Sequence, residues 1–89
     1  MNFEFDLAKD ASNLARHGVP LSLVERLEWD AAVAWIDDRF EYEELRMTAL
    51  VPEKSVLYFV AYVERGDVMR IISLRWATPR EVKFYVQNF

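Results

Sequence analysis

Residues 70–81 read RIISLRWATPRE, and this stretch contains both a strand and the start of a helix. Its first seven residues are rich in Ile, Leu and Trp, a composition typical of a β-strand. Thr78 then suits a helix N-cap, Pro79 suits the first helical position, and Glu81 suits the returning acid of a capping box. The stretch therefore predicts that a strand ends near Trp76 and that a C-terminal helix follows at once.

Three further runs of the same character precede this strand. Together the four predicted strands cover residues 31–36, 45–51, 56–63 and 69–76. The connections between them are short: an acidic loop near Asp37–Glu43, then residues 52–54, then residues 65–67. Because short turns join antiparallel neighbours, we expect these strands to form a meander.

The N-terminal third predicts a short strand at residues 3–5, followed by two helices. Asp6 can cap the first helix and Gly18 can end it in the left-handed conformation. This helix carries an apolar stripe at helical spacing, formed by Leu7, Ala8, Ala11, Leu14 and Ala15. Ser22 and Glu25 resemble a capping box that opens a second helix.

These elements predict one α+β domain over residues 1–89. Two N-terminal helices and one C-terminal helix are expected to pack over one side of an antiparallel meander sheet of four to five strands. The chain is 53% hydrophobic, which is enough for a compact core in a domain of this size.

Composition excludes several classes of site and protein. There is no cysteine and only one histidine, so we expect neither a disulfide framework nor a zinc site. No segment approaches the roughly 18 consecutive apolar residues of a membrane span. The N-terminus MNFEFD lacks the regions of a signal peptide. The expectation is a soluble cytoplasmic protein without a cofactor.

The net charge of −4 is unevenly distributed along the chain. Residues 25–44 carry a net charge of −6, whereas residues 65–83 carry a net charge of +3. Such a distribution can provide a local anion site on an acidic body. Two ordinary solvated surfaces would show the same distribution, so charge alone leaves both interpretations open.

Alternation along the strands predicts one uncovered face of the sheet. If the more apolar set of each strand forms the core, the other face presents arginines, tyrosines and hydroxyl residues: Arg46, Thr48, Tyr58, Tyr62, Ser73 and Arg75, with Glu44 beside them. Guanidinium groups bind phosphate oxygens in pairs, and tyrosine rings stack on unpaired bases. A face that simply contacts water would show the same residue types.

Three stretches of the chain resemble a known family. The opening FDLAKDASNLARHGV resembles the pattern W-D-x-x-K-x-x-x-N-x-x-K-H-G-V, with Phe5 and Arg16 as departures. ELR in the middle resembles E-x-R, and ERGDVMRIISLRWATPREVKFY completes the likeness. Together they resemble the BrnT family of small toxins from type II toxin–antitoxin pairs, whose fold is similar to that of the RelE ribonucleases. The resemblance implies an RNA-cleaving toxin, neutralised by a BrnA-like antitoxin with a DNA-binding domain. The toxin would then contact operator DNA only through the antitoxin.

An enzyme of this kind uses the 2′-hydroxyl of RNA as the nucleophile, so it requires no metal. Our hypothesis assigns a phosphate clamp to Arg46 and Arg75, the general base to Glu44, and a second cation or proton donor to Lys9. Tyr85 is expected to approach from the last helix.

We expect four further residues to contact RNA: Tyr58, Tyr62, Ser73 and Arg80. Structural roles fit several of these residues as well. Arg46 with Glu44 can form a surface ion pair, Arg80 can be a helix-end charge, and Tyr85 can belong to the core.

Two other functions remain open from the sequence. One is an inactive relative that only binds the antitoxin. The other is a toxin that acts on gyrase, as in the related ParE group.

Overall fold

The computed structural model describes residues 2–39 and 43–89. The predicted acidic loop includes residues 40–42, which lie outside the described residues. The described residues form five strands, two α-helices and two 3₁₀ helices: β1 (Asn2–Glu4), α1 (Leu7–His17), η1 (Leu21–Arg26), η2 (Trp29–Ala31), β2 (Val33–Ile36), β3 (Arg46–Glu53), β4 (Val56–Arg65), β5 (Val68–Trp76) and α2 (Pro79–Asn88).

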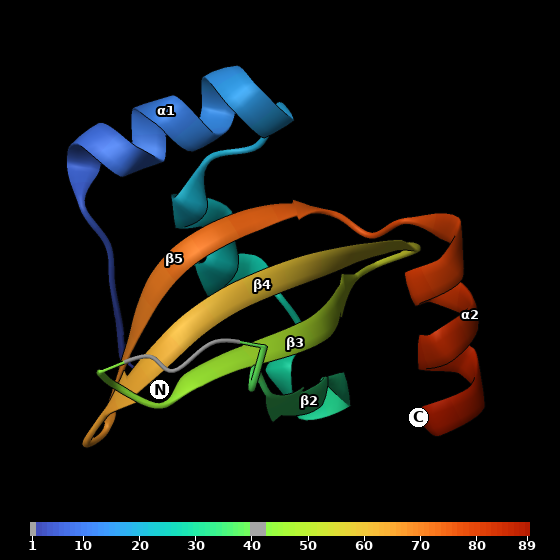
Figure 1. Cartoon of the computed structure of the whole chain (residues 1–89). Helices are drawn as coiled ribbons and strands as arrows, with labels where there is room; N and C mark the ends of the chain where they lie inside the picture. Colours follow the sequence, from blue (N-terminus) through green and yellow to red (C-terminus); the bar gives the residue numbers. More distant parts are fainter. Residues whose placement is uncertain (1, 40–42) are drawn as a thin grey trace.

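The five strands form one mixed sheet in the order β1-β5-β4-β3-β2. Strands β2 to β5 pair antiparallel with their sequence neighbours, so the meander is confirmed. Strand β1 pairs parallel with β5, and the expectation of a purely antiparallel sheet is therefore wrong. The α+β class is confirmed (Figure 1).

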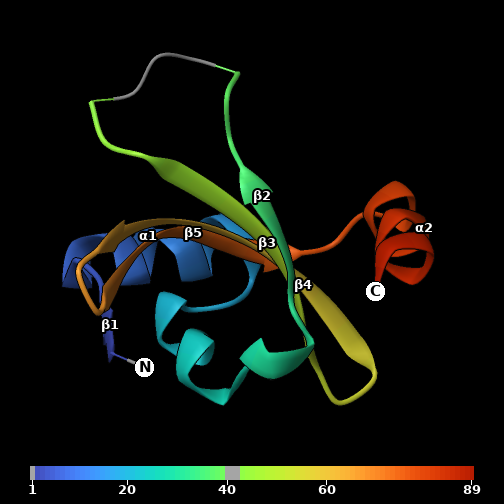
Figure 2. The same cartoon turned by 90° about the horizontal axis from the view of Figure 1, so that it is seen from below.

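The core lies between the sheet and the 3₁₀ segments, on the side that Figure 2 shows below the strands. The expected second α-helix is instead the 3₁₀ helix η1, with Pro20 at its N-cap and no side-chain cap. Leu21 and Val24 of η1 and its C-cap Leu27 are buried at every third position, which matches the three residues per turn of a 3₁₀ helix, and Leu23 is buried as well. The Ser22–Glu25 capping box does not form because Ser22 lies inside the element.

A change of register in β5 alters which residues share a face. Ser73 pairs with Ala61, but Ile71 pairs with Tyr62, so the ladder skips Ile72. One extra residue in a strand reverses the alternation beyond it. Ile71 is therefore buried in the core, contrary to the expected alternation.

The face of the sheet opposite η1 and η2, here called the outer face, is set by this register. It carries residues of three strands: Arg46, Thr48, Leu50, Phe59, Ala61, Ser73 and Arg75. The expected placement of Arg46, Thr48, Ser73 and Arg75 on one face is confirmed, but the expectation that this face is uncovered is wrong at its centre, where Thr48 is buried. Arg70 also belongs to this face and bonds Glu4 at 2.6 Å.

Helix α1 lies along β5 (Figure 1). Its apolar stripe is exposed to solvent. Asp6 caps the helix by accepting from the N–H groups of Ala8 and Lys9, and Gly18 ends it at φ 79°, as predicted. Leu7 and Leu14 are nevertheless exposed, and Asn13 is the buried residue of the helix. Residues 18–27 and the sheet already fill the core, so α1 contacts the sheet through its polar face.

Helix α2 stands beyond the end of β5, apart from α1 (Figure 1). The predicted capping box forms in full, because Thr78 accepts from the N–H of Glu81 while Glu81 accepts from the N–H of Thr78. Tyr85 donates a 2.6 Å hydrogen bond to the carbonyl of Ala31. The expectation that all helices cover one side of the sheet is therefore wrong, since α2 borders the outer face.

Candidate functional site

A basic cavity of about 390 Å³ lies between α1 and the outer face of the sheet. Three cations line it: Lys9 and Arg16 from α1, and Arg46 from the start of β3. Its other lining residues are Ser12, Asn13, His17, Ile72 and Ser73. We refer to this set as the α1 cavity. It gathers positive charge, hydroxyl groups and the chain's only imidazole in one place.

Asn13 fixes the position of α1 over this cavity. Its side-chain amide donates to the carbonyls of Val19 and Leu74, at 2.8 and 2.6 Å, and its Oδ1 accepts from the N–H of Leu74 at 3.3 Å. The buried carboxamide thus occupies the edge of β5 beyond the end of β1, as a neighbouring strand would. Lys9, Ser12 and Arg16 lie on the same face of α1 as Asn13. The hydrogen bonds of Asn13 therefore direct these three side chains toward the cavity.

Three residues of the sequence hypothesis meet in the α1 cavity: Lys9, Arg46 and Ser73. The sequence hypothesis included neither Arg16 nor His17. The available signal was the spacing of Lys9, Ser12, Asn13 and Arg16, which marks a polar face opposite the apolar stripe. The stripe suggested that the apolar face would turn inward, and α1 has the reverse orientation.

Arg75 lies in a different cavity from Arg46. Its guanidinium bonds both carboxylate oxygens of Glu81, at 2.8 and 3.0 Å, and its Cζ stands 3.9 Å from the ring centroid of Phe59. Arg75 lies level with Leu50 in the ladder, four residues along β3 from Arg46. The two positions are therefore roughly 13 Å apart along the strands and two strands apart across the sheet. The expected clamp on one phosphate needs both guanidinium groups at one place, whereas Arg46 and Arg75 line separate cavities.

Glu44 lies outside the α1 cavity. Its carboxylate receives two hydrogen bonds from Arg65, at 2.8 and 2.7 Å. The hydrogen bonds from Arg65 hold the pKa of Glu44 below its usual value, which makes this carboxylate a weaker base. The alternative interpretation paired Glu44 with Arg46, whereas the structure pairs Glu44 with Arg65.

Tyr58 and Tyr62 face the core, so their expected place on the uncovered face is wrong. Both are buried, and Tyr62 packs edge-on against Trp29. Burial raises the pKa of the Tyr62 hydroxyl. Both alternating sets of β4 are apolar, so the predicted face depends on the tyrosine hydroxyl groups alone, and packing overrides this weak polar signal.

The last two predicted residues belong to α2. Burial and nearby Glu28 raise the pKa of Tyr85, whose hydroxyl bonds to the carbonyl of Ala31. Arg80 borders an apolar cleft formed by Trp35, Leu50 and Phe84. Neither residue lines the α1 cavity.

This arrangement can bind an anion on α1 and transfer protons beside it. Over residues 5–81 the chain matches the family described as "Ribonuclease toxin, BrnT, of type II toxin-antitoxin system". The chain belongs to this BrnT family. No curated protein matches it.

The matched span includes Lys9, His17, Arg46, Ser73 and Arg75. Membership makes the chain a relative of ribonuclease toxins and implies a protein antitoxin as its partner. Among residues 2–39 and 43–89, no three His, Cys, Asp or Glu side chains form a group suited to a metal ion. Over the same part of the chain, no helix has the length and apolar character that crossing a membrane requires.

Proposed function

We propose that the chain is an endoribonuclease toxin that cleaves RNA in the α1 cavity. The observation that carries the proposal is the convergence of Lys9, Arg16 and Arg46 around His17 and Ser73. Three cations can neutralise the charge of a scissile phosphate, and an imidazole is the side chain best suited to proton transfer near neutral pH.

The proposed reaction needs no added nucleophile. A base removes the proton of the 2′-hydroxyl, and the 2′-oxygen forms a bond to phosphorus. The bond from phosphorus to the 5′-oxygen then breaks, and that oxygen takes up a proton. The products carry a 2′,3′-cyclic phosphate and a 5′-hydroxyl. Lys9 and Arg46 bind the nonbridging oxygens, so a divalent cation is not required.

His17 replaces Glu44 as the proposed proton acceptor in this scheme. Glu44 is held by Arg65, whereas His17 lines the cavity beside the cations. Lys9 keeps the role of a cation that can also donate a proton to the leaving oxygen. Arg75 acts on a neighbouring part of the RNA rather than on the scissile phosphate.

The proposed partner is a BrnA-like antitoxin with a DNA-binding domain. Membership in a type II family supports a protein antitoxin, and the toxin would reach operator DNA only through it. Exposed apolar side chains on both helices, including Leu7, Leu14 and Val86, provide surface for such a partner.

Cleavage of a single-stranded RNA oligonucleotide tests the proposal. We expect cyclic-phosphate products in the presence of excess EDTA. His17→Ala should lower the rate by about 10²- to 10⁴-fold, and Lys9→Ala and Arg46→Ala should also lower it, with the fold of each variant confirmed by circular dichroism.

Arg26→Ala is the matched control. Arg26 is an exposed arginine that does not line the cavity, and its ion-pair partner Glu53 lies 3.6 Å away. This variant should cleave at the native rate. Native cleavage by a folded Lys9→Ala/Arg46→Ala double variant would rule out the α1 cavity as the site.

A further inference from the structure

We propose that the apolar cleft between β2 and α2 binds one unpaired base of the RNA strand whose scissile phosphate lies in the α1 cavity. The inference rests on the proposed function, because it adds a second contact for the same substrate. The cleft is lined by Trp35, Leu50, Arg80, Glu81 and Phe84, and we refer to it as the aromatic cleft.

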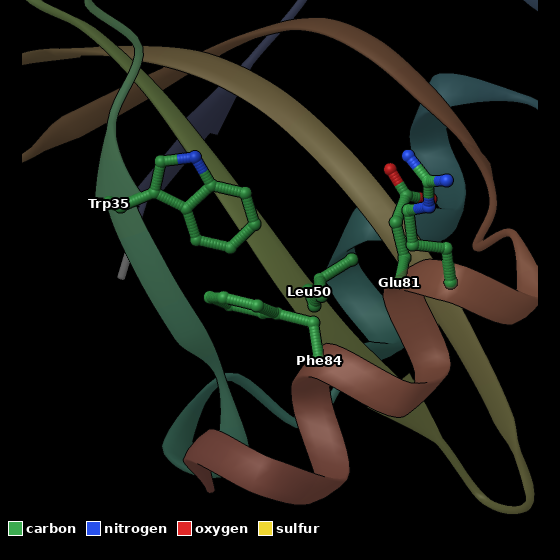
Figure 3. A pocket seen from close by; sticks show the side chains of 5 residues that line it. Trp35, Leu50, Glu81 and Phe84 are labelled. Atoms are coloured by element: carbon green, nitrogen blue, oxygen red, sulfur yellow. The ribbon is translucent and has the colours of Figure 1, made fainter.

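The shape of the aromatic cleft suits a flat ring. Figure 3 shows the rings of Trp35 and Phe84 projecting from β2 and α2 toward the same space, beside Leu50. Their centroids lie 5.3 Å apart with an interplanar angle of 64°, so one ring supports the other. Trp35 is 36% exposed and Phe84 43% exposed, whereas Leu50 is fully buried and forms the floor. The cavity volume is about 420 Å³, within the range of small-ligand pockets.

A further cavity lies between the aromatic cleft and the α1 cavity, and neighbouring residues of β5 line it and the α1 cavity. This middle cavity shares Trp35 and Glu81 with the cleft, and Arg75 lines it from β5. Ser73, two residues earlier on the same face of β5, lines the α1 cavity. Thr48 and Ala61 at the centre of the outer face are buried, so the proposed route of an RNA strand from Lys9 and Arg46 to Trp35 passes the partly exposed Ser73 and Arg75.

The charges along this route are less negative than those of the chain as a whole, so they repel RNA less than the rest of the acidic chain does. Among residues 2–39 and 43–89, three arginines and three acids line the middle cavity and the cleft: Arg39, Arg75, Arg80, Asp37, Asp38 and Glu81. They balance, although the chain as a whole carries a net charge of −4. Arg80 at the rim can contact a phosphate next to the bound base. Aromatic faces of this kind bind bases of unpaired RNA regardless of sequence.

The distance between the two cavities determines how long an RNA must be to reach the cleft. Roughly 13 Å of strand separates the levels of Arg46 and Leu50 in the sheet. A dinucleotide bound in the α1 cavity therefore leaves the cleft empty, whereas a longer oligonucleotide fills it.

Binding of uncleavable 2′-deoxy oligonucleotides, followed by fluorescence anisotropy, tests the proposal. Trp35→Ala and Phe84→Ala should each weaken binding of a long oligonucleotide by roughly 5- to 100-fold and leave dinucleotide binding unchanged. With RNA substrates, the same variants should raise the KM of the long substrate and leave cleavage of a dinucleotide at the native rate.

Trp76→Ala is the matched control, because Trp76 is an exposed tryptophan that does not line the cleft, and it should bind as the native chain does. Native affinity of both cleft variants for the long oligonucleotide would overturn the inference. If both variants lose binding to a BrnA-like antitoxin while their RNA affinity is unchanged, the inference is also overturned, because the cleft is then a protein-docking site. If Arg46→Ala has no effect while Trp35→Ala weakens binding, the proposed cleavage site fails and the base site stands.

Discussion

At the scale of single residues, the position of α1 depends on Asn13. Its carboxamide makes three hydrogen bonds to the main chain of Val19 and Leu74, and substitution by Ala leaves those buried groups without partners. We expect Asn13→Ala to lower the free energy of unfolding by about 3 kcal/mol, measured by urea denaturation. RNA cleavage should fall as well, because α1 carries Lys9 and Arg16.

Ser12→Ala provides the control for this prediction. Ser12 is the exposed neighbour of Asn13, so its substitution by Ala should change the free energy of unfolding by less than about 0.5 kcal/mol. A similar loss in both variants would mean that the effect comes from the helix itself rather than from the contact with β5.

At the scale of elements, α2 is held to the sheet by Glu81 at its N-terminus. Burial of this carboxylate acts to raise its pKa, but hydrogen bonds from Arg75 and Thr78 outweigh burial and hold the pKa below the usual value of 4.5. Because the folded-state pKa is lowered, the stabilisation is present above about pH 4.5 and is lost as the pH falls through the lowered pKa. The stability difference between the native chain and Glu81→Gln should therefore shrink below about pH 4.5, as measured by urea denaturation at several pH values.

Thr78→Ala separates the cap from the ion pair. It removes the N-cap acceptor and leaves Arg75 and Glu81 in place, so we expect a loss of about 1 kcal/mol. A stability difference for Glu81→Gln that stays constant from about pH 6 to about pH 3 would show that the carboxylate does not hold α2.

At the scale of the whole molecule, binding of RNA must overcome the net charge of −4. The cations of the α1 cavity are Lys9, Arg16 and Arg46. Three phosphate contacts with a single strand predict a slope of about −2 for the logarithm of the binding constant against that of salt concentration. Anisotropy titrations should give this slope, and Arg46→Ala should reduce it by about 0.7. A slope near zero would mean that the cavity does not bind phosphate.

The local signals in the sequence were sufficient for the ends of most elements. Asp6, Gly18 and the Thr78–Glu81 capping box act through hydrogen bonds to residues within four positions, so their geometry follows from spacing alone. The pairing of the four meander strands also follows from local sequence, because the short turns between them permit few pairings. The grouping of Arg46 and Ser73 on one face also followed from alternation.

Other features depend on contacts between distant segments. The skipped residue Ile72 changed the alternation of β5, and packing against η1 decided which apolar set of β4 faces inward. Glu44 and Arg75 lie near the expected site in sequence, but Arg65 and Glu81 hold them elsewhere.

By itself, the sequence determined the caps, the strand order of the meander and the likeness to the BrnT family, because these depend on neighbouring residues and on motifs read in order. Only the tertiary structure decided that α1 turns its polar face to the sheet and brings Lys9, Arg16 and His17 to Arg46. The physical reason is that η1 already fills the core, and the Asn13 carboxamide is bonded to the edge of β5. The orientation of α1 therefore follows from contacts made 61 residues apart.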